Sequence, residues 1–194
     1  MSKHSNDTPP STGFIIVNSV FVLALVALGA FSAWPIYESP SYLVLVGVAV
    51  AVAVVIAFVS LIQAWSWFTV LLVGIGAYLV LGVPLGVPSA LEDPAHLGVA
   101  WLQFINATVF GWKQLVTVTI PVGTYQALLV PALFLFFFTS LAALSLSWRA
   151  ARLHLLVVPL LLLLPLFGLA FGPSTQSERS TVLWVDVSVR EFFI

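Results

Sequence analysis

The sequence predicts an all-α membrane protein, in which a bundle of five transmembrane helices carries an interfacial helix in the outer loop between spans three and four. The first reason is composition, because 61% of the 194 residues are hydrophobic and only 7% are charged, whereas soluble domains carry about 25% charged residues. The second reason is where the charges lie. None of the six Lys and Arg residues and none of the seven Asp and Glu residues falls inside the five long apolar runs.

The length of these runs predicts helices rather than strands. In lipid every backbone N–H and C=O must be paired within the protein, so a spanning segment is a helix or part of a closed barrel. A helix needs about 20 continuously apolar residues, whereas a barrel strand needs about ten with alternation. The runs have the helical pattern, and we expect spans at about 14–34, 42–62, 68–83, 127–148 and 153–171.

Short polar or Gly/Pro-containing segments separate the runs. Residues 1–13 form a polar tail that we expect to be flexible, and the first run is too long for a cleaved signal peptide. Pro35–Pro40 predicts a turn, and Gln63–Trp67 predicts a tight turn with two tryptophans at headgroup level. The Gly/Pro-rich stretch after the third run predicts that its helix ends at Val83.

Two runs carry internal patterns. Ala49, Ala53 and Ala57 recur every four residues. This spacing lets a neighbouring helix approach closely, but an Ala/Val-rich helix also produces it by chance, and the sequence leaves both interpretations open. Pro159 and Pro165 predict a kinked fifth helix.

The outer loop, residues 84–126, contains a predicted amphipathic helix at Leu97–Phe110. Its apolar side carries Leu97, Trp101, Phe104, Ile105 and Trp112, and its polar side carries Gln103, Asn106 and Lys113. Such a helix lies in the interface plane or enters the bundle as a re-entrant segment, because it is too short to span. We favour the surface helix. Val116–Ile120 alternates Val and Thr and predicts an extended strap before Pro121.

Charge at the turns predicts the orientation. Arg149 and Arg152 place the connection between spans four and five in the cytoplasm, because short cytoplasmic loops are rich in Lys and Arg. Alternation then puts the N-terminal tail inside and loop 84–126 outside. It also puts the tail 173–194 outside, in a cell membrane that the chain crosses several times. In that tail, Leu183–Val189 alternates and favours a strand.

Few residues suit chemistry. Glu92, Asp93 and His96 are metal-ligand types, but there are three of them without a fourth, so we expect a solvated loop and no metal. The absence of cysteine excludes disulfides, Fe–S clusters and thiol nucleophiles. No catalytic or cofactor-binding residue is predicted, and a net charge of −1 offers nothing to nucleic acid.

The remaining candidates are interfacial or contact residues. His154 is the one titratable side chain within an apolar run, and we interpret it as a hydrated histidine at headgroup depth. The predicted contact residues are Trp101, Trp112, Lys113, Arg149, Arg152 and His154. Their partners are expected to be the lipid bilayer and a membrane or envelope protein.

One stretch of the chain resembles a known family. Gly111–Val118, Ile120–Tyr125 and Leu128–Pro131 are similar to the N-terminal membrane region of actinobacterial transglutaminase-like membrane proteins. The resemblance implies a multi-pass membrane domain followed, on the outer side, by a catalytic domain with a Cys-His-Asp site. This chain has no cysteine, so no catalytic residue carries over. We therefore expect a fragment, a truncated product or a membrane subunit beside a separate catalytic partner.

These observations predict an integral membrane anchor or scaffold domain without catalytic activity of its own. The alternative is a small transporter or channel subunit, motivated by the two prolines of the fifth run and by the broken segment Gly82–Pro88. A lipid-modifying enzyme is a third hypothesis, for which His96 and His154 would have to supply the catalytic groups.

Overall fold

The structure is a computed structural model that describes residues 12–87, 97–118, 121–123, 127–149, 154–172, 180–182 and 185–187. The described chain forms the elements α1 (Thr12–Tyr37), α2 (Pro40–Ile62), α3 (Trp67–Gly86), α4 (Leu97–Thr117), α5 (Leu129–Arg149), the 3₁₀ turn η3 (His154–Leu156), α6 (Val157–Phe171), β1 (Ser180–Val182) and β2 (Val185–Val187). The membrane part of the chain is helical, as predicted. Helices α1, α2, α3 and α5 are each long and apolar enough to cross a bilayer, and α6 is apolar but has 15 residues.

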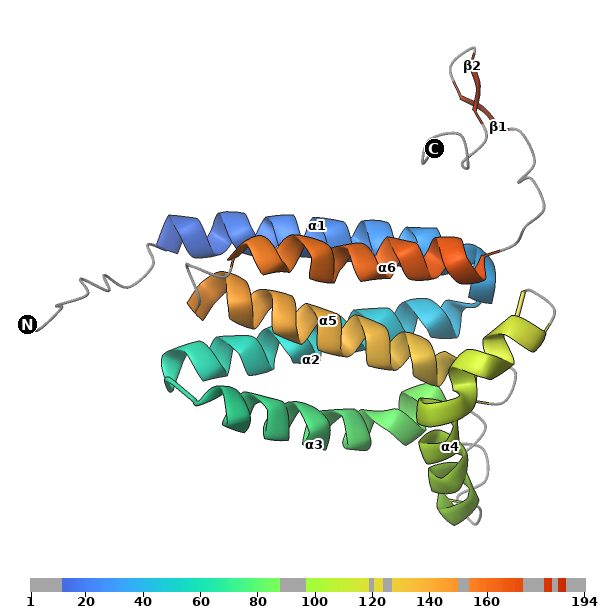
Figure 1. Cartoon of the computed structure of the whole chain (residues 1–194), viewed down its shortest axis with the longest axis horizontal. Helices are drawn as coiled ribbons and strands as arrows, with labels where there is room; N and C mark the ends of the chain where they lie inside the picture. The colour runs from blue at the N-terminus through green and yellow to red at the C-terminus, as the bar shows by residue number, and fades with distance from the viewer. Residues whose placement is uncertain are drawn as a thin grey trace, which may run out of the picture.

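The helices form a bundle in which α5 is central. Helices α1, α2, α3, α5 and α6 run side by side, and α4 crosses one end of the bundle (Figure 1). Helix α5 touches each of the five other α-helices. Of the 18 most apolar consecutive residues of α5, 72% are buried. The corresponding shares for α1, α2 and α3 are 17%, 39% and 28%. Helix α5 is therefore the most buried of the four long helices and lies at the centre of the core.

Serine caps and prolines explain several helix boundaries. Ser39 and Ser66 cap α2 and α3, and the Ser66 hydroxyl accepts a hydrogen bond from the amide of Thr69 at 3.1 Å. Helix α1 continues through Pro35 to Tyr37, and α3 continues through Pro84 to Gly86. The predicted turn beginning at Pro35 and the predicted end at Val83 are therefore wrong by a few residues. The φ of proline is helical, and so close to a helix end it removes only one hydrogen bond.

Two other expectations need correction. The predicted strap at Val116–Ile120 is wrong for its first two residues, because α4 continues to Thr117. The amphipathic helix is thus longer than the predicted Leu97–Phe110. In the tail, the part of the predicted strand Leu183–Val189 that the structure describes is β2, which pairs antiparallel with β1 in the register Ser180 to Val187, and the rest of that prediction lies outside the described residues.

The alanine pattern of α2 is a packing surface. Ala49, Ala53 and Ala57 are all fully buried, and the most extensive helix pairing in the bundle joins α2 to α5. Small side chains let two backbones approach closely, which is a main source of helix association in lipid. The structure therefore favours close approach over a chance stripe.

Glycines let α1 and α6 approach closely. A Cβ on Gly168 would lie 2.6 Å from the carbonyl carbon and oxygen of Ser32, and a Cβ on Gly29 would overlap the side chain of Leu164. The obstacle at Gly168 is backbone, which cannot rotate away. This pair of glycines therefore determines how closely the last helix packs on the first.

We expect Gly168→Ala to destabilise the bundle by about 1–3 kcal/mol, because the added methyl group separates α1 from α6. Gly47→Ala is the matched control, since nothing lies within 4 Å of a Cβ at Gly47 and alanine is the better helix former. Unfolding by SDS in mixed micelles, followed by circular dichroism, measures both. Equal stability of the two variants would contradict the close-packing account.

Candidate functional site

The predicted contact residues divide between the two ends of the bundle. Trp101, Trp112 and Lys113 lie on α4, whereas Arg149 ends α5 beside the turn between α2 and α3 (Figure 1). We call these the α4 end and the Arg149 end. His154 begins η3, and the structure describes its backbone only. Arg152 lies outside the described residues, as do Glu92, Asp93 and His96.

Helix α4 has three different faces around its axis. The first face is buried against the bundle and carries Ala100, Phe104, Ala107, Gly111 and Leu115. The second face is exposed and apolar, and carries Trp101, Leu102, Ile105, Val109 and Val116. The third face is exposed and carries the polar residues Gln103, Asn106, Lys113, Gln114 and Thr117, together with the exposed apolar residues Val99 and Phe110. At 3.6 residues per turn these sets follow one another around the helix.

The buried face of α4 is held by shape. A Cβ on Gly82 of α3 would overlap the ring of Phe104, so this glycine provides the space that the ring occupies. A Cβ on Gly111 would lie 2.8 Å from Cγ of Pro131 on α5. Two glycines, one on each side of the contact, thus let α4 rest directly on α3 and α5.

An aromatic cluster surrounds this contact. The ring of Tyr78 lies 5.1 Å from that of Phe104 and 5.7 Å from that of Phe134. Trp112 contacts Phe134 and Phe167 edge-on, at 6.2 and 6.1 Å. Such edge-to-face pairs add roughly 0.5–1.5 kcal/mol each beyond the area they bury.

One hydrogen bond between side chains links α4 to α3. The Tyr78 hydroxyl lies 2.9 Å from Oγ1 of Thr108, which itself donates to the carbonyl of Phe104 at 2.9 Å. Because the threonine proton is used within α4, Tyr78 is the donor of the bond between the helices. The sequence analysis did not predict this bond. The signal that could have indicated it is a tyrosine inside an otherwise apolar run, because a buried tyrosine hydroxyl needs a hydrogen-bond partner.

A pair of stacked tyrosines also lies at the α4 end. The rings of Tyr37 and Tyr42 stack at 4.7 Å and 8°. Tyr37 donates to the carbonyl of Leu128 at 3.3 Å, and Tyr42 donates to that of Ala30 at 3.0 Å. The first bond ties the chain entering α5 to α1, and the second joins α2 to α1.

At the Arg149 end, a cation meets two tryptophans. The Nη2 atom of Arg149 donates to the carbonyl of Trp65, and its Cζ lies 5.0 Å from the ring centroid of Trp67. The preceding residue, Trp148, is buried and donates from Nε1 to Oγ of Ser19 at 3.0 Å. The sequence predicted the arginine and both tryptophans for the same membrane face, but not that they touch.

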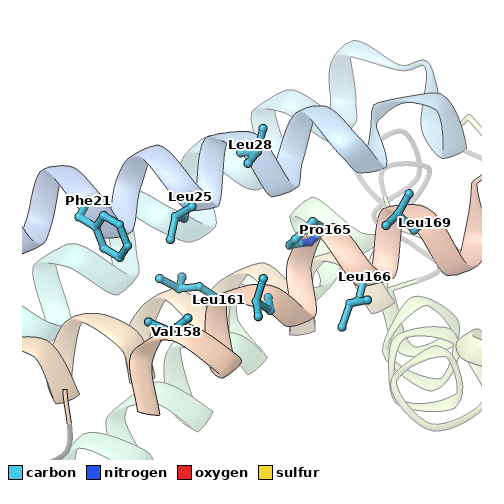
Figure 2. A pocket seen from close by; sticks show the side chains of 9 residues that line it. Phe21, Leu25, Leu28, Val158, Leu161, Pro165, Leu166 and Leu169 are labelled. Carbon is cyan, nitrogen blue, oxygen red and sulfur yellow. The ribbon is translucent and has the colours of Figure 1, made fainter. Parts of the chain in front are cut away.

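A groove between α1 and α6 has a volume of about 390 Å³. Figure 2 shows the side chains of both helices along it. It is lined by Phe21, Leu25, Leu28, Val158, Leu161, Leu162, Pro165, Leu166 and Leu169. All nine are apolar, so the groove can accommodate hydrocarbon but offers no group for catalysis. Among the described residues, no three His, Cys, Asp or Glu side chains come together as a metal site.

Comparisons with protein-family models, with curated proteins and with solved structures found no match. The resemblance to transglutaminase-like membrane proteins therefore stays a prediction.

We expect the bond between Tyr78 and Thr108 to hold α4 on the bundle. Tyr78→Phe and Thr108→Val should each expose α4 to faster amide exchange, and a double-mutant cycle should give a coupling of about 0.5–1.5 kcal/mol. Thr117→Val is the control, because the Thr117 hydroxyl donates only within α4, to Gln114 at 3.0 Å and to Lys113 at 3.5 Å. Exchange mass spectrometry measures the effect, and additive single effects would mean that the two hydroxyls do not interact.

Proposed function

We propose that the protein is a membrane anchor or scaffold domain without catalytic activity of its own, which holds α4 at the outer membrane surface. The observation that carries this proposal is the three-sided character of α4. A helix that packs on a bundle with one side, exposes an apolar second side and carries its polar residues on the third is suited to the boundary between lipid and water. Its position across the bundle end, rather than along it, supports the same location (Figure 1).

We propose five spans, with α6 as the fifth. A helix of 15 residues is about 22 Å long, and the three residues of η3 add about 6 Å. The sum approaches the roughly 30 Å of a hydrocarbon core, and a small shortfall is met by local thinning of the bilayer. The pairing of α6 with α1, which is second in extent only to that of α2 with α5, supports a spanning role.

Aromatic residues at both ends support the placement of the bilayer. Trp65, Trp67 and Trp148 gather at the Arg149 end, and Trp101 and Trp112 lie at the α4 end. Tryptophan is enriched at the two membrane interfaces. We propose that the Arg149 end is cytoplasmic, with the N-terminus on that side and the C-terminal tail outside.

The polar side of α4 is the proposed contact surface for a partner. Gln103, Asn106 and Lys113 are exposed together on a helix that the bundle holds in place by Gly82 and Gly111. A rigid, exposed polar face costs little ordering entropy on binding. The resemblance to transglutaminase-like membrane proteins makes a separate catalytic domain on the outer side one candidate partner.

Single cysteines test the placement of α4, because the natural chain has none. We expect an environment-sensitive label at Ile105 or Val116 to report an apolar surrounding and to be quenched by spin-labelled lipid. Labels at Gln103 and Gln114 should be quenched by an aqueous agent instead. Each polar position lies two residues from one of the apolar positions, on the opposite side of α4, so equal quenching of all four would contradict an interfacial helix.

Photo-crosslinking and flux measurements test the scaffold role. A photoreactive residue at Asn106 should form a defined protein adduct in native membranes, whereas one at Val80, a 73% exposed apolar position on α3, should crosslink lipid. Purified protein in liposomes should show no substrate-dependent flux. A measurable flux from the chain alone would favour the transporter or channel function instead.

A further inference from the structure

Arg149 is a cation held in a defined position at the membrane face. Its side chain is half-buried, its Nη2 donates to the Trp65 carbonyl, and its guanidinium lies over the ring of Trp67. Both contacts come from the junction of α2 and α3. The buried neighbour Trp148, bonded to Ser19 of α1, fixes the end of α5 from the other side. The charge is therefore positioned by three helices.

This cation keeps unused hydrogen-bonding capacity. Its Nη1 atom is buried and has no hydrogen-bond partner in the described part of the chain. A charged donor removed from water without an acceptor is costly, and a negative charge beside the part-exposed guanidinium would offset that cost without having to reach the enclosed Nη1 atom. The one acidic side chain that the structure describes, that of Glu38, is exposed at the turn between α1 and α2, at the α4 end (Figure 1). It cannot neutralise Arg149.

The first turn of α3 adds donors beside the arginine. Ser66 caps the amide of Thr69, and the Val70 amide donates to the Ser66 carbonyl at 3.1 Å. The amides of Trp67 and Phe68 precede the first helical hydrogen bond and have no acceptor within the helix. Because Trp67 both begins α3 and places its ring under the guanidinium, the arginine lies next to this helix start. The partial positive charge of the helix start acts in the same direction.

The surroundings of the region favour a lipid over a soluble anion. Ile62 and Phe68, which flank the α2–α3 turn, are 68% and 73% exposed, and both continue into the apolar outer surfaces of α2 and α3. An anion bound here would therefore have hydrocarbon-compatible surface directly next to it. A phosphate group with acyl chains attached matches both the positive charge and the apolar surface beside it. A free phosphate matches only the positive charge.

We propose that Arg149, together with the first turn of α3, binds the phosphate group of an anionic phospholipid at this face of the membrane. The guanidinium supplies positive charge and directed hydrogen-bond donors, and the exposed apolar surface of α3 contacts the acyl chains. A headgroup that carries its own cation, such as choline, is disfavoured because the site is already positive. The proposal does not depend on the scaffold role, only on the location of the chain in a bilayer.

The test compares lipids and variants on the full chain in detergent. Native mass spectrometry with added phosphatidylglycerol or phosphatidylcholine gives a dissociation constant for each. We expect phosphatidylglycerol to bind more tightly, and Arg149→Gln to weaken it roughly ten- to hundredfold, as loss of hydrogen bonds to a charged group implies. Arg149→Lys should give an intermediate loss, because it keeps the charge but not the planar arrangement of donors.

Lys3→Gln is the matched control, since it removes one positive charge at a position with no part in the proposed site and should leave the binding unchanged. Circular dichroism of each variant in the same detergent confirms that the helices are retained, and Arg149→Lys still tests the site if Arg149→Gln fails to fold. Unchanged binding of phosphatidylglycerol to Arg149→Gln would overturn the proposal. Equal affinity for the two lipids would overturn it for anionic lipids, and displacement by millimolar inorganic phosphate would reassign the site to a soluble anion.

Discussion

The packing of α5 against every other α-helix is the constraint on which the rest of the bundle depends. In lipid the hydrophobic effect does not drive helices together, so close contact of side chains must do so. The neighbours of α5 supply small residues where they meet it. A Cβ on Gly74 of α3 would lie 2.8 Å from Leu141, and α4 meets Pro131 at Gly111. Small residues thus let α3 and α4 approach α5 closely.

Polar interactions between helices are concentrated at the two ends of the bundle. At the α4 end the hydroxyls of Tyr37, Tyr42 and Tyr78 reach carbonyl or threonine oxygens on other segments. At the Arg149 end the indole of Trp148 and the guanidinium play the same part. The long middle of the bundle relies on shape, and the ends add direction and register. This division suits a bilayer, whose interfaces tolerate polar groups that its centre does not.

The ends of the bundle also differ from each other, which bears on function. The α4 end presents a held amphipathic helix with a polar face, which suits a macromolecular partner. The Arg149 end presents a positioned cation next to exposed apolar surface, which suits a lipid headgroup. A domain that binds lipid at one face and displays a helix at the other would fix the depth and tilt of that helix. The proposed anchor role and the proposed lipid site are thus mechanically compatible.

Much of the secondary structure could be read from local pattern. The runs at 42–62 and 127–148 match α2 and α5 to within two residues, because an apolar segment in lipid must satisfy its backbone within itself and so becomes a helix whatever surrounds it. The central position of α5, the contact of Arg149 with Trp67 and the length of α4 could not be read in this way. Leu, Val, Ala and Phe surfaces resemble one another in sequence. Which of them meet depends on where glycine leaves space for a neighbour's side chain, and that is a property of two helices at once.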